Sequence, residues 1–198
     1  MKRANGKSAL VELVDGAIDY AGAFPPAELP VERAFRNYLG YRRSPGAQLL
    51  GRFVCTLPQL STITELLKKN EEKKVYLTLI APTLEAPAVM SRNAPLRVTA
   101  LETKVEPASF PSLEQHIRSF ADRKIDVLVE PLCGAAPTLE TLTPMLESMS
   151  RIGADLTRGS RIGLKLRLGV PSDLHVPKLS DLAAILLACA VRGIPLKL

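Results

Sequence analysis

Short β-like runs alternate with helix-like runs along the chain, and this alternation limits the fold more than any other sequence feature. The expected strands cover residues 16–22, 49–55, 74–82, 97–107, 125–134, 161–169 and 194–198. Helical patterns separate them at 31–43, 61–70, 112–123, 138–153 and 180–193, together with a poor helix at 83–94 that Pro87 interrupts. Successive strands begin about 30 residues apart, the size of a βα unit. We therefore predict an α/β fold with a parallel sheet.

Two architectures fit this alternation, a doubly wound sheet and a (β/α)8 barrel. A doubly wound dinucleotide-binding sheet has a glycine-rich first turn, whereas the segment at 20–30, "YAGAFPPAELP", lacks G-x-G-x-x-G. A barrel of eight units needs one more helix and strand than the sequence contains. We predict a TIM-barrel-like domain over residues 1–198, truncated after its seventh strand. No domain-sized linker interrupts it.

Charged residues on the strands favour the barrel. In the segment "GLKLRLG", Lys165 and Arg167 alternate with leucines and so occupy the opposite face. In a doubly wound sheet both faces lie under helices, but the inner face of a barrel accepts polar groups near the carboxyl ends of its strands. Six expected strands carry charges opposite their aliphatic residues: Asp19, Arg52, Glu102, Lys104, Glu130, Lys165, Arg167 and Lys197. Five are positive and three are negative, so we expect ion pairs and a surplus that attracts an anion.

Each of these charges also has a purely structural alternative. In these alternatives, Glu102 and Lys104 form a purely structural pair, Arg52 lies on the surface at a strand end, and Asp19 caps the loop after its strand. The two cations of the sixth strand lie on a solvated edge strand. These alternatives remain open at the level of the sequence.

Composition excludes several classes of function. The net charge is +6, but the basic residues are spread along the chain, so nucleic acid is not an expected partner. Cys55, Cys133 and Cys189 are far apart and have no metal or redox spacing, as is typical of reduced thiols in a cytoplasmic protein. The sequence shows neither a signal-peptide pattern nor an apolar run long enough to span a membrane, so we expect no membrane association.

The segment "DYAGAFPPAELPVERAFRNYLGYRRSPGAQLLGRFV" at 19–54 resembles an uncharacterised bacterial family that shares a D-Y-A-G-x-F-P-P-A opening followed by a helix and G-R-F-V. The later "LKLRLG" is also similar, although Val170 stands where the family usually has another glycine. The strand that matches "IPLK" continues in the family as K-A-T-A-G-L-H-H-P, which this sequence does not contain. No activity is established for that family, so the resemblance implies a fold and not a reaction.

The layout of lysines is similar to that of class I aldolases of the deoxyribose-phosphate type. Those enzymes carry lysines on consecutive late barrel strands, and Lys165 and Lys197 would be the two lysines here. The similarity is one of layout alone, because the motifs do not match residue by residue.

The first functional hypothesis is a metal-independent lyase or aldolase-like enzyme for a small anionic carbonyl or sugar-like compound, without a cofactor. Lys165 would form a Schiff base, with Lys197 or Arg167 favouring its neutral amine form. Glu130 would be the general acid and base. The anionic group would be bound by Arg167 and Arg52, and the remaining substrate contacts would come from Glu102, Lys104 and Asp19.

The second hypothesis is a non-catalytic ligand-binding barrel or a truncated, inactive one. An open sheet edge would then favour a homodimer. A third possibility is metal-assisted chemistry through Asp19, Glu102 and Glu130, which the surplus of cations at the same site disfavours. We therefore expect no metal site.

Overall fold

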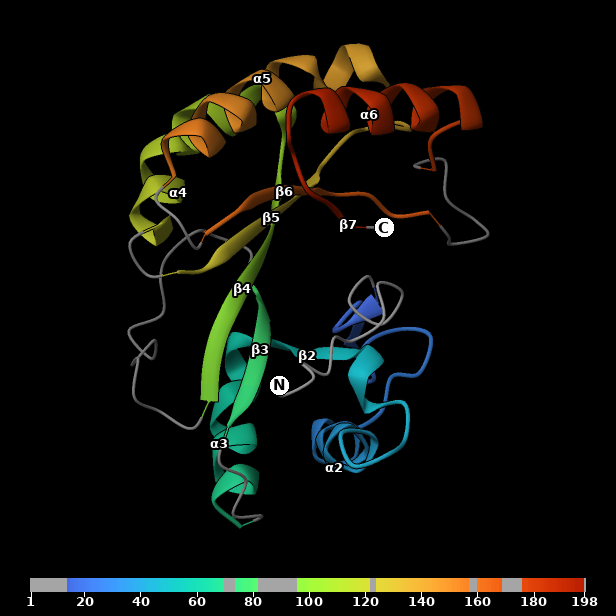
Figure 1. Cartoon of the computed structure of the whole chain (residues 1–198), viewed down its shortest axis with the longest axis vertical. Coiled ribbons are helices and arrows are strands. Elements are labelled where there is room, and N and C mark those ends of the chain that lie inside the picture. The colour runs from blue at the N-terminus through green and yellow to red at the C-terminus, as the bar shows by residue number, and fades with distance from the viewer. Residues whose placement is uncertain are drawn as a thin grey trace, which may run out of the picture. The chain divides into compact units, whose positions relative to one another are not determined.

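The computed structural model describes residues 14–69, 74–81, 96–121, 124–156, 160–168 and 176–197 (Figure 1). The chain divides into two compact units, one from residues 1–80 and 88–98 and the other from residues 81–87 and 99–198. The expected poor helix at 83–94 lies outside the described residues. The interpretation of residues 1–198 as a single domain stays a prediction.

Three parallel strands form the sheet of the first unit, and β2 lies between the other two. Their bounds are β1 (Ile18–Tyr20), β2 (Leu50–Thr56) and β3 (Val75–Ile80). Two described helices of this unit pack against each other, and they are α2 (Val31–Tyr41) and α3 (Leu60–Lys69). Short 3₁₀ turns lead into and out of β2, namely η1 (Ala47–Leu49) and η2 (Leu57–Gln59).

An aromatic cluster forms the core between α2 and β2. The buried rings of Phe35 and Phe53 meet edge to face at 5.2 Å, and the buried ring of Tyr38 lies 5.5 Å from that of Phe53. The Tyr38 hydroxyl donates a hydrogen bond of 2.8 Å to the carbonyl oxygen of Gly51. A buried tyrosine needs such a partner for its polar end, so this bond fixes α2 over β2.

Four parallel strands form the sheet of the second unit, in chain order. They are β4 (Leu96–Val105), whose residues from 99 onward belong to this unit, β5 (Asp126–Pro131), β6 (Ile162–Lys165) and β7 (Leu196–Lys197). The helical elements are η3 (Pro107–Leu113), α4 (Glu114–Ala121), α5 (Leu139–Asp155) and α6 (Leu179–Val191). In Figure 1, α4, α5 and α6 lie on one side of β5 and β6, and α5 packs on both β6 and α6.

The sheet of the second unit has one aliphatic face and one charged face. A Cβ atom on Gly153 of α5 would lie 3.7 Å from Cγ2 of Ile162, so Ile162 faces the helices, and so does the fully buried Leu164 two residues on. Because successive side chains of a strand point to opposite faces, Gly163 and Lys165 lie on the other face. The predicted division between leucines under helices and charges opposite them is confirmed for β6.

Gly163 is required where β6 runs beside its neighbours. A Cβ atom at this position would lie 2.8 Å from the carbonyl oxygen of Pro195 and 2.9 Å from Cδ2 of Leu128. These distances are too short for a side chain, so glycine lets the strands approach closely just below Lys165.

The predicted alternation of strands and helices and the parallel pairing are confirmed for the described strands. The sixth and seventh strands are shorter than predicted, because β6 ends at Lys165 and β7 spans two residues. Gly169 and Leu198, which we placed in those strands, lie outside the described residues. In the described part of the chain, no helix has both the length and the apolar character to cross a membrane.

Candidate functional site

A row of charged side chains crosses the four strands of the second unit. Lys104 of β4 pairs in register with Glu130 of β5, and Lys165 of β6 pairs in register with Lys197 of β7. The register between β5 and β6 brings Glu130 beside Lys165. All four lie at or next to the carboxyl ends of their strands, where ligand sites of parallel α/β proteins occur.

Glu102 joins the two lysines of this row through a single carboxylate. Its Oε2 accepts a bond of 2.6 Å from the Lys165 Nζ, and its Oε1 accepts one of 2.7 Å from the Lys197 Nζ. β4 and β7 are three strand spacings apart, so their backbones would lie about 14 Å apart in a flat sheet. Lys197 also lies two residues further along its strand than the position level with Glu102. The side chains of Glu102 and Lys197 would not span this separation. The sheet of this unit therefore curls around its charged face, with Glu102 and Lys165 mostly enclosed.

Glu130 is the second anionic centre of the row. Its Oε1 lies 2.7 Å from Arg167 Nε and 3.5 Å from Lys104 Nζ, and its Oε2 lies 3.4 Å from Lys165 Nζ. Burial alone would raise the pKa of Glu130, but the charges of Lys165, Arg167 and Lys104 outweigh it and hold this pKa below its ordinary value of 4.5. Glu130 is therefore a carboxylate at neutral pH.

These six side chains, which we call the lysine cluster, carry a surplus of positive charge: Glu102, Lys104, Glu130, Lys165, Arg167 and Lys197. Four cations face two carboxylates, so these six described side chains carry a net charge of +2. Arg167 and Lys104 have about half of their side-chain surface exposed, whereas the two carboxylates are almost buried. The surplus is thus presented on the solvent side, where an anion can reach it.

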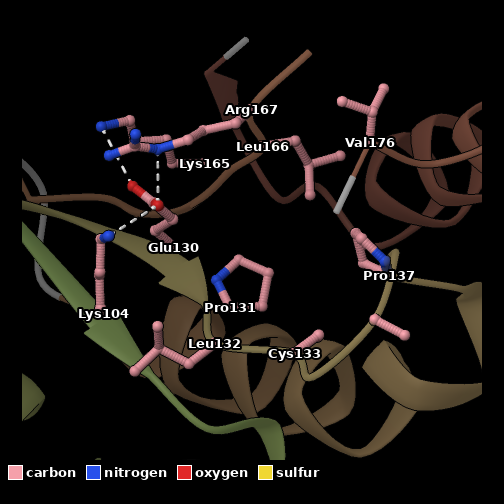
Figure 2. Close-up of a pocket in the computed structure, with 11 residues that line it drawn as sticks. Lys104, Glu130, Pro131, Leu132, Cys133, Pro137, Lys165, Leu166, Arg167 and Val176 are labelled. Atoms are coloured by element: carbon pink, nitrogen blue, oxygen red, sulfur yellow. Dashed lines mark ion pairs between the residues drawn. The ribbon is translucent and has the colours of Figure 1, made fainter. Parts of the chain in front are cut away.

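A cavity of about 250 Å³ opens beside the cluster. Figure 2 shows Lys104, Glu130, Lys165 and Arg167 gathered at one side, with dashed lines marking their ion pairs. The other side is formed by Cys133, Pro137 and Val176, from the segment after β5 and the residues before α6. The volume suits a small molecule and is below that of a typical drug-sized pocket.

Asp19 and Arg52, which we predicted to contact the same substrate, belong to the first unit. Asp19 Oδ1 accepts a hydrogen bond of 2.9 Å from the backbone amide of Arg52, and its Oδ2 accepts one of 3.1 Å from the Thr78 hydroxyl. A Cβ atom on Gly51 would lie 2.7 Å from both Asp19 Oδ1 and the backbone carbonyl oxygen of Gly16, so glycine is needed beside this carboxylate. In the described contacts, Asp19 joins β1 to β2 and β3. A substrate role for Asp19 and Arg52 stays a prediction.

The ion pairs bear on two of the structural alternatives. The described partners of Glu102 are Lys165 and Lys197, and that of Lys104 is Glu130, while a purely structural role for these ion pairs stays an alternative. β6 is not an edge strand, since it pairs with β5 on one side and β7 on the other. The side chain of Lys165 is only 18% exposed and lies between two carboxylates.

The apolar side of the cavity is the part that sequence reasoning missed. Cys133 and Pro137 belong to the segment "LCGAAP" that follows β5 directly. Its position after a strand with a terminal carboxylate was a usable signal, because loops at the carboxyl ends of parallel strands line ligand sites. The residue Val176 carried no comparable signal, since it approaches the cavity from a segment far along the chain.

These features define a class: an α/β protein of parallel strands with a lysine cluster and a small cavity at the strand ends. No protein-family model, curated protein or solved structure matches this chain. Across the described ranges, no three His, Cys, Asp or Glu side chains gather in an arrangement that could hold a metal ion.

Proposed function

We propose that the protein is a metal-independent, aldolase-like lyase that acts on a small anionic carbonyl compound through a Schiff base at Lys165. One observation carries the proposal: the Lys165 amine lines the cavity and is hydrogen-bonded to Glu102, which also holds a second lysine amine. A primary amine beside a proton acceptor and another cation has the surroundings of a Schiff-base lysine.

The chemistry balances with groups of the cluster alone. Glu102 Oε2 takes a proton from Lys165, the amine nitrogen attacks the carbonyl carbon, and a carbon–nitrogen bond forms. The carbonyl oxygen leaves as water after it receives two protons, the one held by Glu102 and a second one that the attached nitrogen gives up, so that a protonated iminium group remains. The resulting iminium group withdraws electrons and weakens an adjacent carbon–carbon or carbon–hydrogen bond.

The other members of the cluster have separate roles in this proposal. Arg167 and Lys104 bind the anionic group, because they are the most exposed cations that line the cavity. Lys197 neutralises Glu102 and is the second amine at the reacting centre. Glu130 remains ionised and acts as a base and an anchor for the cations, a narrower role than the acid and base that we predicted from the sequence.

We also propose that the strands belong to a (β/α)8-type barrel of the TIM class. The alternation of elements, the parallel pairing and the curl of β4 to β7 around a charged inner face support this assignment. A charged inner face at the carboxyl ends of strands is where enzymes with this fold have their active sites.

Reductive trapping tests the proposed chemistry. The protein is incubated with pyruvate, glyceraldehyde 3-phosphate and dihydroxyacetone phosphate in turn, each with sodium cyanoborohydride, and adducts are located by peptide mass spectrometry. We expect an adduct on Lys165 with at least one compound and none in Lys165→Arg, which keeps the positive charge between Glu102 and Glu130. Adducts spread over exposed lysines such as Lys124 and Lys178, or no adduct with any compound, would contradict the proposal.

A second candidate function is anion binding without chemistry. It is favoured by the contacts of Lys165, whose amine is held by Glu102 at 2.6 Å and faces Glu130 at 3.4 Å, so that the amine is an ion-pair partner of two carboxylates. This candidate predicts that phosphate or carboxylates raise the melting temperature, that Arg167→Gln removes the effect, and that no adduct is trapped.

A further inference from the structure

The cavity beside the lysine cluster has two chemically different halves. One half is ionic and consists of Lys104, Glu130, Lys165 and Arg167. The other described lining residues are apolar or weakly polar: Pro131, Leu132, Cys133, Ala135, Pro137, Leu166 and Val176. A ligand that fills this cavity must therefore have one charged end and one apolar end.

The ionic half accommodates a carboxylate close to a carbonyl group. Arg167 and Lys165 contact the two oxygens of one and the same carboxylate, that of Glu130. The two cations thus lie on either side of a single small group. A ligand that places an anionic group on Arg167 and a carbonyl carbon at Lys165 must carry these two groups on adjacent or nearly adjacent atoms.

The apolar half accommodates an aliphatic chain better than a hydroxylated one. Its described side chains include three without any polar side-chain atom, Leu132, Pro137 and Val176, and a thiol, Cys133, whose pKa is raised by burial. Hydroxyl groups of a sugar would find no hydrogen-bond partner on the side chains of Leu132, Pro137 and Val176, so contact with them costs free energy. Each methylene group placed there would gain affinity instead.

We propose that the natural ligand is a short-chain aliphatic 2-oxo acid and not a polyhydroxylated sugar phosphate. This inference rests on the proposed function, because it assigns the substrate class of the same site. The carboxylate lies on Arg167 and Lys104, the carbonyl carbon lies at Lys165, and the chain lies against Pro137 and Val176. Val176 is then a specificity-determining residue that selects for chain length.

Acetate and butanoate test the substrate class without a carbonyl, and therefore independently of the Schiff base. Dissociation constants come from melting temperatures measured over a range of ligand concentrations. We expect butanoate to bind about tenfold more tightly than acetate, since each buried methylene adds about three- to fourfold. Cys133 lines the cavity, so bound butanoate should slow the alkylation of this thiol by an added reagent. The alkylation rate of the buried Cys55 is the internal reference, and a change at Cys133 alone places the ligand in the cavity.

Matched variants separate the two halves of the cavity. Val176→Thr should lower the ratio of butanoate to acetate affinity by about threefold, because a hydroxyl replaces a methyl group near the chain. Val191→Thr is the control, since Val191 lies on α6, is 77% exposed and does not line the cavity. Arg167→Gln should weaken both carboxylates equally and leave their ratio unchanged.

The outcomes distinguish the inference from the proposed function. Equal affinities for acetate and butanoate, or an unchanged ratio in Val176→Thr, would overturn the substrate class, even if Lys165 traps a sugar phosphate. A clear chain-length preference without any trapped adduct would support the substrate class and contradict the Schiff-base chemistry. Adducts on Lys165 with pyruvate and 2-oxobutanoate, together with the preference, support both.

Discussion

At the scale of single residues, Glu130 decides the electrostatics of the cavity. It is enclosed, yet its pKa lies below the ordinary value because three cations contact it. A folded-state pKa below the unfolded one means that ionised Glu130 stabilises the fold above about pH 4.5. That stabilisation is lost as the pH falls through the lowered pKa and Glu130 takes up a proton.

We predict that Glu130→Gln lowers the free energy of unfolding by about 1–3 kcal/mol at pH 7, because three cations lose their common partner. The difference from the unsubstituted protein should shrink as the pH falls below 4.5 through the lowered pKa and Glu130 itself takes up a proton. Urea unfolding of both proteins at pH 7, 5.5, 4.5 and 3 measures this difference in the free energy of unfolding.

Glu147→Gln is the matched control, because Glu147 lies exposed on α5. Its effect should stay within about 0.5 kcal/mol at every pH. A stability difference for Glu130→Gln that stays constant from pH 7 to pH 3 would show that its charge is not what stabilises the fold.

At the scale of elements, the close approach of β6 to its neighbours sets the geometry of the two lysines that bind Glu102. Gly163 leaves room for the Pro195 carbonyl and the Leu128 side chain, and the next residues along β6 and β7 bring Lys165 level with Lys197. A curled sheet then allows one carboxylate, Glu102, to bridge both amines. The site therefore depends on a residue that carries no side chain.

We predict that Gly163→Ala destabilises the protein by about 1–3 kcal/mol, because the added methyl group would clash with backbone and side-chain atoms at less than 3 Å. Chemical denaturation measures the loss, and weaker protection of Cys133 by butanoate would show that the cavity is disturbed. Gly153→Ala is the control, because a Cβ atom on Gly153 in α5 would lie 3.7 Å from Ile162 Cγ2, an ordinary contact distance. Alanine at this position should stabilise the helix by about 0.5–1 kcal/mol. Similar effects for both substitutions would contradict this account.

At the scale of the whole molecule, charge and apolar surface are unevenly distributed. The chain carries a net charge of +6, whereas the outer face of α6 exposes Leu179, Leu187 and Val191 at 82%, 66% and 77%. Exposed apolar strips of this kind promote association. The buried side of the same helix is formed by Ile185, Ala188 and Cys189.

We predict that Leu187→Lys changes the free energy of unfolding by less than about 0.5 kcal/mol. It should nevertheless lower the association of the protein at high concentration, which light scattering over a concentration series measures. Leu164→Ala, at a fully buried position, should by contrast cost about 2–5 kcal/mol. Unchanged scattering in Leu187→Lys would show that the outer face of α6 does not drive association.

The sequence by itself determined the order of the described strands and helices and the charged face of β4, β5 and β6. Strand periodicity is two residues, so the position of Lys165 between two leucines already placed it opposite the helices. The same rule placed Glu102 and Glu130 on the charged face. These predictions depend only on local geometry, which is why a single sequence was sufficient for them.

Only the tertiary structure decided which charges meet. Glu102 binds lysines that are 63 and 95 residues away in the chain, and the curl of the sheet makes this possible. Val176 and Cys133 line one cavity although 43 residues separate them. Side-chain contacts across several strands depend on twist, curl and register, which are cooperative properties of the packed sheet, whereas the alternation of faces is fixed by each strand alone.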